Sequence, residues 1–323
     1  MKAIRIHEKG GPEVLRFEDI DVPAPAAGEL LIDVDAAGLN FIEVYHRIAL
    51  YPVKYPMTLG SEAAGVVRAV GVGVTGFKVG DRVVSQSVRG SYAESAIVPA
   101  ERAVVIPEGI SSKLAGAMWL QGLTAHYLTT SVFPAAKGQR ALVHAAAGGV
   151  GLLLCQMLKR RGAFVIGTAS TEEKRALAHD AGADEMIDYT TKDFVAETKR
   201  ITGGAGVHVV YDSVGQATFE KSLDCLVRRG MMALFGQSSG AVQPFDPLIL
   251  NRKGSLFMTR PKLDDYVATR DELETRSKEL FDWVARGLVH VHIGAEVSLA
   301  QAVDAHRALE GRKTTGKVVL LPT

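Results

Sequence analysis

The sequence contains few cysteines, almost no net charge and no long apolar run. Its two cysteines, Cys155 and Cys225, stand in unrelated contexts, which excludes a cysteine-rich zinc site and disfavours a disulfide framework. The formal net charge is +1, so nothing indicates a surface built for polyanions. No apolar stretch approaches the roughly 20 residues of a membrane span, and the first residues lack the apolar core of a signal peptide. We therefore expect a cytoplasmic protein.

The pattern of expected strands and helices changes near residue 121. Its 323 residues, 47% of them hydrophobic, are enough for about two domains. Before residue 121, short alternating segments separated by glycine turns predict a β-rich, partly barrelled domain. After it, apolar strands alternate with helices, which predicts a parallel sheet covered on both faces. Such a sheet binds its ligand at the carboxyl ends of its strands. The expected strands of the sheet are 140–144, 163–168, 186–189, 207–212, 231–235 and 255–259.

Residues 141–151 combine a strand, a glycine turn and the start of a helix. A helix start carries free N–H groups and a positive dipole end, so Gly148, Gly149 and Val150 are candidates to hold a pyrophosphate. Gly151 permits close packing of helix and strand. Ala146 replaces the first glycine of the usual fingerprint, yet the order of the elements indicates a dinucleotide site.

The tip of the next strand indicates which dinucleotide binds. NAD sites usually place a carboxylate there, whereas this chain has Ser170, followed by Lys174 and Arg175 one turn later. Hydroxyls and cations suit a 2′-phosphate, so the sequence favours NADPH over NADH. The alternative is a solvated helix face, on which Glu172 and Glu173 neutralise the cations. Ser213, Phe235 and Gly236 follow the later strands and are further candidates for cofactor contacts, or ordinary turn residues.

Several segments together resemble a known family over almost the whole chain. The sequence is similar to the zinc-independent quinone oxidoreductases, the ζ-crystallin type, of the medium-chain dehydrogenase/reductase superfamily. The 38–47 and 258–261 segments are the more specific ones, whereas the 80–83 turn marks only the superfamily. The segments that carry the likeness are 38–47, 60–65, 80–83, 121–128, 141–151 and 258–261.

The resemblance implies an α/β fold in two domains. A GroES-like, β-rich catalytic domain is expected over residues 1–122. A Rossmann domain with a doubly wound parallel sheet is expected over 123–260, and residues 261–323 are expected to return to the catalytic domain.

The resemblance also implies a metal-free reductase. Zinc alcohol dehydrogenases carry a zinc-ligating histidine in a Gly-His-Glu motif, and Ser61 stands at that position here. A catalytic zinc ion needs three protein ligands, mostly Cys and His. Without it, side chains must stabilise charge on the substrate oxygen.

Relatives point to Asn40, Tyr45 and Arg260 as the catalytic residues. Tyr45 and Arg260 are expected to donate to an anionic oxygen, in a cleft between the domains. Asn40 is expected beside the nicotinamide. From periodicity alone, Tyr45 is instead a half-buried helix aromatic. The further cofactor contacts expected are Thr124, Tyr189, which matches a position near the adenosine phosphate, Met258 and Lys317.

The function implied is an NADPH-dependent quinone reductase that acts by direct hydride transfer. An enoyl or enone reductase remains a second enzyme reading, because pocket shape sets substrate choice. A crystallin-like structural role or RNA binding is the non-enzymatic alternative, and the near-neutral charge disfavours nucleic acid. The apolar strand 254–259 is expected at a sheet edge, where it would pair with a second copy in a homodimer.

Overall fold

The computed structural model describes residues 1–322, which divide into two compact units. Unit 1 comprises Met1–Gln121 together with the segment from Thr269 onward, and unit 2 comprises Gly122–Ala268. The sequence placed 261–268 with the returning segment, whereas the structure groups these residues with unit 2. One reason is that Tyr266 stacks on Tyr127, with the ring centroids 4.3 Å apart. No helix among the described residues is long and apolar enough to span a membrane.

Unit 1 is the β-rich unit. Its larger sheet has the order β15-β16-β3-β5-β6-β8, with β7 pairing with β3, and a smaller sheet has the order β2-β1-β4. The strands are β1 (Lys2–Ile6), β2 (Arg16–Asp19), β3 (Glu29–Leu39), β4 (Met57–Thr58), β5 (Ala63–Val70), β6 (Arg82–Ser85), β7 (Ser95–Pro99), β8 (Val104–Val105), β15 (Ile293–Ser298) and β16 (Lys317–Leu321). Its helices are α1 (Phe41–Arg47), α8 (Arg270–Ala285), α9 (Ala302–Glu310) and the first part of α2 (Ser112–Tyr127).

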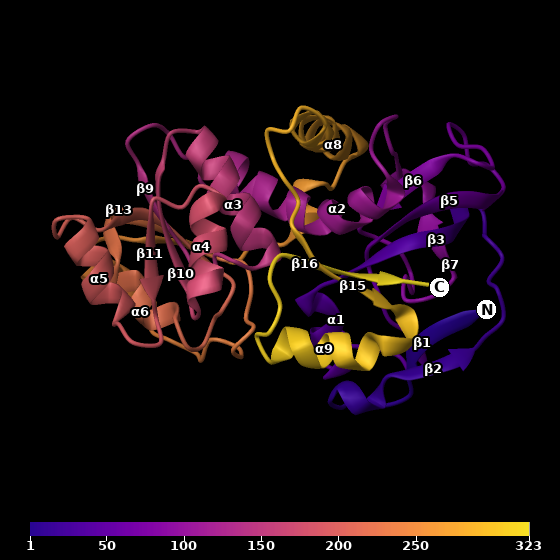
Figure 1. Ribbon diagram of the computed structural model, residues 1–323, viewed down its shortest axis with the longest axis horizontal. Coiled ribbons are helices and arrows are strands. Elements are labelled where there is room, and N and C mark those ends of the chain that lie inside the picture. Colours follow the sequence, from indigo (N-terminus) through magenta and orange to yellow (C-terminus); the bar gives the residue numbers. More distant parts are fainter. Residues whose placement is uncertain (323) are drawn as a thin grey trace. The chain divides into compact units, whose positions relative to one another are not determined.

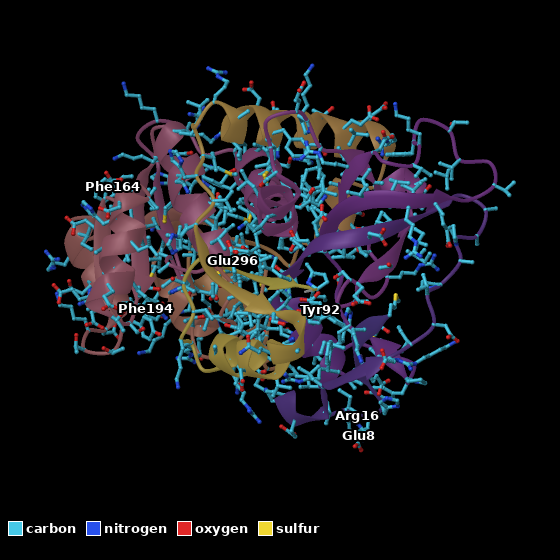
Figure 2. The ribbon with its side chains drawn as sticks, turned by 45° about the vertical axis from the view of Figure 1, so that its right-hand side comes forward. Glu8, Arg16, Tyr92, Phe164, Phe194 and Glu296 are labelled. Carbon is cyan, nitrogen blue, oxygen red and sulfur yellow. The ribbon has the colours of Figure 1, made fainter. Side chains whose placement is uncertain are left out.

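Both ends of the chain build the core of unit 1. Strand β16 pairs antiparallel with β3, so that Val318 lies opposite Leu39. Figure 1 shows the yellow C-terminal elements α9, β15 and β16 beside the indigo N-terminal ones. Tyr92, labelled in Figure 2, is buried in this core, and its ring meets His306 of α9 edge-on at 5.9 Å between centroids. The segment after residue 268 is thus an integral part of unit 1.

Unit 2 is the α/β unit, and the predicted parallel sheet is confirmed. Its strands are parallel throughout, in the order β11-β10-β9-β12-β13-β14. Figure 1 shows α3 to α6 packed around these strands. The strands are β9 (Arg140–Val143), β10 (Phe164–Ala169), β11 (Glu185–Asp188), β12 (Val207–Asp212), β13 (Leu226–Leu234) and β14 (Phe257–Thr259), and the helices are α3 (Gly149–Arg160), α4 (Glu172–Asp180), α5 (Phe194–Ile201), α6 (Phe219–Asp224) and α7 (Leu248–Arg252).

The strand order creates a switch point beside β9. The chain runs outward from β9 to β10 and β11, and then returns to place β12 on the other side of β9. Connections therefore diverge at the carboxyl ends of β9 and β12, which is where doubly wound sheets bind ligands. Apolar side chains such as Leu142, Ile166 and Val210, together with Phe194 of α5, which Figure 2 labels, fill the core around the sheet.

The edge strand β14 is shorter than the sequence predicted. The expected strand began at Ser255, but the structure starts it at Phe257. Ser255 has a φ of 56°, in the left-handed region, which interrupts an extended strand. The apolar pattern indicated the strand correctly, and only its first two residues were misassigned.

Candidate functional site

The glycine turn after β9 places the start of α3 at the carboxyl edge of the sheet. Gly148 is the residue before α3, and no side chain caps the helix there. A Cβ on Gly151 would collide with the carbonyl oxygens of Ala145 and Ala146, so only glycine allows the turn to close onto the helix. Ala145 itself adopts a φ of 50°. The turn thus leaves the N–H groups of the first helical residues without a side-chain cap, as an anion site requires.

The tips of β10 and β11 carry the residues expected at the adenosine end of a cofactor. These parallel strands are in register, with Ala169 opposite Asp188, so Ser170 and Tyr189 leave the sheet at the same edge. Lys174 is half-buried in the first turn of α4, where its N–H donates to the Thr171 hydroxyl at 3.3 Å. No carboxylate stands at the tip of β10 itself, in keeping with the sequence.

Arg175, the second cation of this region, already has partners within unit 2. Its guanidinium lies 2.8 Å from Asp188 and also donates to the Ser170 carbonyl at 3.3 Å. Glu172 and Glu173 are exposed in the same helical turn. The assignment of Lys174 to a phosphate remains a prediction from the sequence.

A buried aspartate organises the loops after β12 and β13. Asp212 accepts hydrogen bonds from the N–H groups of Val214 at 2.7 Å and Gly215 at 3.0 Å. The Phe235 N–H donates to the Asp212 carbonyl at 2.8 Å. A Cβ on Gly236 would collide with the Ser213 backbone. Sequence reasoning selected these loops but missed Asp212, although an aspartate followed by Ser-x-Gly is a common turn signature.

Unit 2 thus gathers most of the predicted cofactor residues along one sheet edge. Thr124 does not follow a strand but is buried in the part of α2 that belongs to unit 2. Arg260 follows β14 directly, is exposed, and donates to the Pro261 carbonyl at 3.4 Å. The residues at or just after the carboxyl ends of the strands are Gly148, Gly149, Val150, Ser170, Lys174, Tyr189, Ser213, Phe235, Gly236, Met258 and Arg260.

The remaining predicted residues, Asn40, Tyr45 and Lys317, belong to unit 1. Asn40 stands where β3 ends and α1 begins. Tyr45 lies one turn further along α1, is buried, and its ring meets Tyr51 edge-on at 5.9 Å between centroids. Lys317 opens β16, the strand paired with β3, which brings it next to Asn40.

Asn40 belongs to a buried polar cluster that the sequence did not reveal. Its amide Nδ2 donates to Glu62 at 2.9 Å, and its Oδ1 accepts from Lys317 at 2.8 Å. Lys317 and Glu62 form an ion pair at 2.5 Å, with side chains 1% and 0% exposed. Glu62 has no sequence signal beyond its place in the Gly-Ser-Glu segment. Lys317 therefore commits its ammonium group to Glu62 and Asn40.

Glu43 is a second buried carboxyl group beside this cluster. It accepts hydrogen bonds from the N–H of Asn40 at 2.8 Å and of Ser61 at 3.1 Å. Burial raises its pKa from 4.5 to about 7, against the opposing charge of Lys317. A glutamate three residues into a helix commonly bonds back to the N-cap N–H, so the spacing from Asn40 is the signal that could have found it.

The structure offers no obvious metal-ligand set in the part of the chain that it describes. Residues 1–322 contain no group of three His, Cys, Asp or Glu side chains placed to hold a metal ion. Both cysteines are buried thiols, and burial raises the pKa of each to about 12. Metal independence remains a prediction, which chelation can test.

The two units together define a medium-chain dehydrogenase/reductase. Residues 26–108 match the family described as alcohol dehydrogenase GroES-like domain, and residues 149–267 match the zinc-binding dehydrogenase family. Quinone oxidoreductase 1 of Escherichia coli is 46% identical over 323 residues, 99% of each chain. The structure of the Escherichia coli quinone oxidoreductase complexed with NADPH superposes with a TM-score of 0.98 at 45% identity, over 100% of both chains. A 2-haloacrylate reductase from Burkholderia sp. is 42% identical over 98% of each chain.

The chain therefore belongs to the quinone oxidoreductase family of that superfamily, and the resemblance stated from the sequence motifs is confirmed.

Proposed function

We propose that the protein is an NADPH-dependent quinone oxidoreductase that transfers a hydride directly to a quinone without a metal ion. The observation that carries the proposal is the full-length likeness to a quinone oxidoreductase whose structure was determined with NADPH. The arrangement of this chain's own residues supports the same conclusion in two respects.

The residues of unit 2 fit a phosphorylated dinucleotide. The uncapped start of α3 supplies N–H groups and a positive dipole end for a pyrophosphate. Ser170 and Lys174 supply a hydroxyl and an ammonium group at the adjacent strand tip, which suits a 2′-phosphate rather than a free ribose hydroxyl. Tyr189 is 38% exposed next to them and is proposed to contact the adenosine end.

Two side chains are proposed to stabilise the acceptor oxygen. NADPH, when bound, supplies a hydride, and one hydride and one proton convert a quinone to a hydroquinone. Tyr45 offers a phenol O–H, and Arg260 keeps most of its five N–H donors beyond its 3.4 Å bond to Pro261. Donors aimed at the oxygen where charge develops lower the barrier. Asn40 is proposed to position the nicotinamide.

A substrate and cofactor panel tests the proposal. Steady-state rates are measured with 1,4-benzoquinone, 9,10-phenanthrenequinone and a 2-alkenal, each with NADPH and with NADH. We expect kcat/KM for the better quinone to exceed that of the 2-alkenal by at least roughly tenfold, and NADPH to be preferred. Equal or better turnover of the alkenal would favour the second candidate, an enone reductase, which the likeness to a 2-haloacrylate reductase supports.

We also propose that the protein is a cytoplasmic homodimer. Strand β14 ends the sheet order of unit 2, and Phe257 on it is 57% exposed. An apolar edge strand is a natural site for pairing with another chain, so we propose that the homodimer forms along β14. A cytoplasmic location is also included, and the two free thiols are compatible with a reducing compartment.

A further inference from the structure

The side-chain amide of Asn40 has no hydrogen-bonding capacity to spare. An amide offers two N–H donors and two lone pairs on its oxygen. The donors go to Glu62 at 2.9 Å and to the Gly38 carbonyl at 3.3 Å. The oxygen accepts from Lys317 at 2.8 Å and from Gln121 at 3.2 Å. All four partners lie in unit 1, so the amide is fully satisfied within that unit.

The ion pair also selects one of the two orientations of this amide. An ammonium group on one side attracts the amide oxygen, and a carboxylate on the other side attracts the NH₂ group. Rotating the amide by half a turn would set donor against donor and acceptor against acceptor. In a buried site such mismatches cost far more than in water, so Glu62 and Lys317 hold Asn40 in a single state.

The ion pair occupies space that a side chain at position 38 would fill. A Cβ on Gly38 would collide with the Glu62 carboxylate and the Lys317 ammonium group, although the Gly38 backbone does not adopt a positive φ. The second Glu62 oxygen accepts from the Leu120 N–H at 2.6 Å. Strand β3 carries Gly38 and pairs with both β5 and β16. Glu62 immediately precedes β5 and Lys317 is the first residue of β16, so the two pairings bring the charges together beside Gly38.

We propose that Glu62 and Lys317 are positioning residues for the reduction, acting through Asn40 by fixing the orientation of its side-chain amide. This inference rests on the proposed function for its catalytic meaning. Lys317 then serves the cofactor through Asn40 rather than by contacting it. A ligand that bonds to Asn40 must displace one of the two longer partners, and Gln121, which is half-exposed, is the group able to give way.

The first test needs neither cofactor nor turnover. The chain contains only two asparagines, Asn40 and Asn251, and Asn251 is exposed, so ¹⁵N-asparagine labelling gives one signal of interest and one internal control. We expect the Asn40 NH₂ protons to exchange with water at least roughly tenfold more slowly than those of Asn251. In the paired variant Glu62→Gln/Lys317→Met, the Asn40 exchange should accelerate and Asn251 should not change. Equal exchange at both asparagines in the wild type would overturn the proposal.

The paired variant is chosen so that the fold survives. Removing one partner leaves a buried uncompensated charge, whereas replacing both with neutral groups of similar size is often tolerated. Glu310→Gln is the matched control, because it removes the carboxylate of another ion pair in unit 1, with Arg47 at 2.8 Å, away from Asn40. Circular dichroism and thermal midpoints establish that each variant is folded.

The second test is kinetic. We expect the paired variant to lower kcat roughly tenfold while leaving the NADPH KM within about twofold, because the phosphate-binding residues lie in unit 2. Adding Asn40→Ala to it should lower kcat no further than Asn40→Ala alone, and Glu310→Gln should leave kcat unchanged. A folded paired variant with wild-type kcat, or losses that simply multiply, would overturn the positioning role. Failure of the wild type to reduce any quinone would instead refute the proposed function and leave the exchange test standing.

Discussion

At the residue scale, we propose that Lys174 determines the choice between NADPH and NADH. Lys174 follows the tip of β10, where the residues of the sequence suit a phosphate, and it is the cation proposed to contact the 2′-phosphate. A well-placed Lys–phosphate contact is worth on the order of 1.5–3 kcal/mol. We expect Lys174→Ala to raise the NADPH KM by roughly tenfold or more and to leave the NADH KM nearly unchanged. Lys199→Ala, which removes an exposed lysine of α5, is the control. Equal effects on both cofactors would refute the 2′-phosphate assignment.

The second prediction at the residue scale concerns the hydroxyl group of Tyr45. Loss of an essential oxyanion donor costs on the order of 10²-fold in rate, but quinones accept hydride readily, so we expect Tyr45→Phe to lower the rate roughly tenfold. Pre-steady-state single-turnover rates give the comparison, and Tyr51→Phe, which removes the hydroxyl of a neighbouring ring, is the matched control. An unchanged rate in Tyr45→Phe would assign Tyr45 to packing, which is the alternative that its buried position allows.

Glu43 should make the stability of the fold depend on pH. Its pKa is about 7 in the folded chain and 4.5 as the reference value, so between these values the folded state binds more protons than the unfolded state. Stability therefore falls as pH rises through this window, by at most on the order of 3 kcal/mol. Urea unfolding at pH 5 and pH 8 should show a smaller loss for Glu43→Gln than for the wild type. The exposed Glu108→Gln should match the wild type, and a Glu43→Gln loss as large as the wild-type loss would contradict the account.

At the scale of elements, the sequence predicted the parallel sheet and the edge at which most cofactor candidates lie. This was possible because most of these candidates lie in the turn or the first helical turn after an apolar strand, a pattern local in sequence. The cluster around Asn40 could not be predicted in this way. Lys317 and Glu62 are 255 residues apart, and composition alone places charged side chains at the surface. The pairing of β16 with β3 decides their burial, and only tertiary structure reveals it.

The prediction at the scale of elements concerns dimer formation along strand β14. If the homodimer forms along this edge, a charge on the edge should disrupt it. We expect the wild type to sediment as a dimer at micromolar concentration and Phe257→Glu as a monomer. Val72→Glu introduces the same charge at a residue that is 82% exposed in unit 1 and should remain dimeric. A wild-type monomer, or a Phe257→Glu dimer, would refute pairing through β14.

At the scale of the whole molecule, the proposed function draws on residues of both units. Unit 2 supplies the uncapped start of α3 and the cationic tip after β10. Unit 1 contains Tyr45 and the Asn40 amide, which is hydrogen-bonded to Glu62 and Lys317, and both residues are proposed to act in the reaction. The full-length likeness to quinone oxidoreductases covers both units, which is why the proposal assigns the reaction to the entire chain.

The most direct test of this account is a single turnover with NADPH deuterated at the transferred position. The protein is first dialysed against a strong chelator, its zinc content is determined, and NADPH oxidation by 1,4-benzoquinone is followed with labelled and unlabelled cofactor. We predict full activity without stoichiometric zinc, one hydroquinone formed per NADPH, and slower oxidation of the deuterated cofactor. Oxidation that requires added zinc, or that proceeds at the same rate with both cofactors, would contradict metal-free direct hydride transfer.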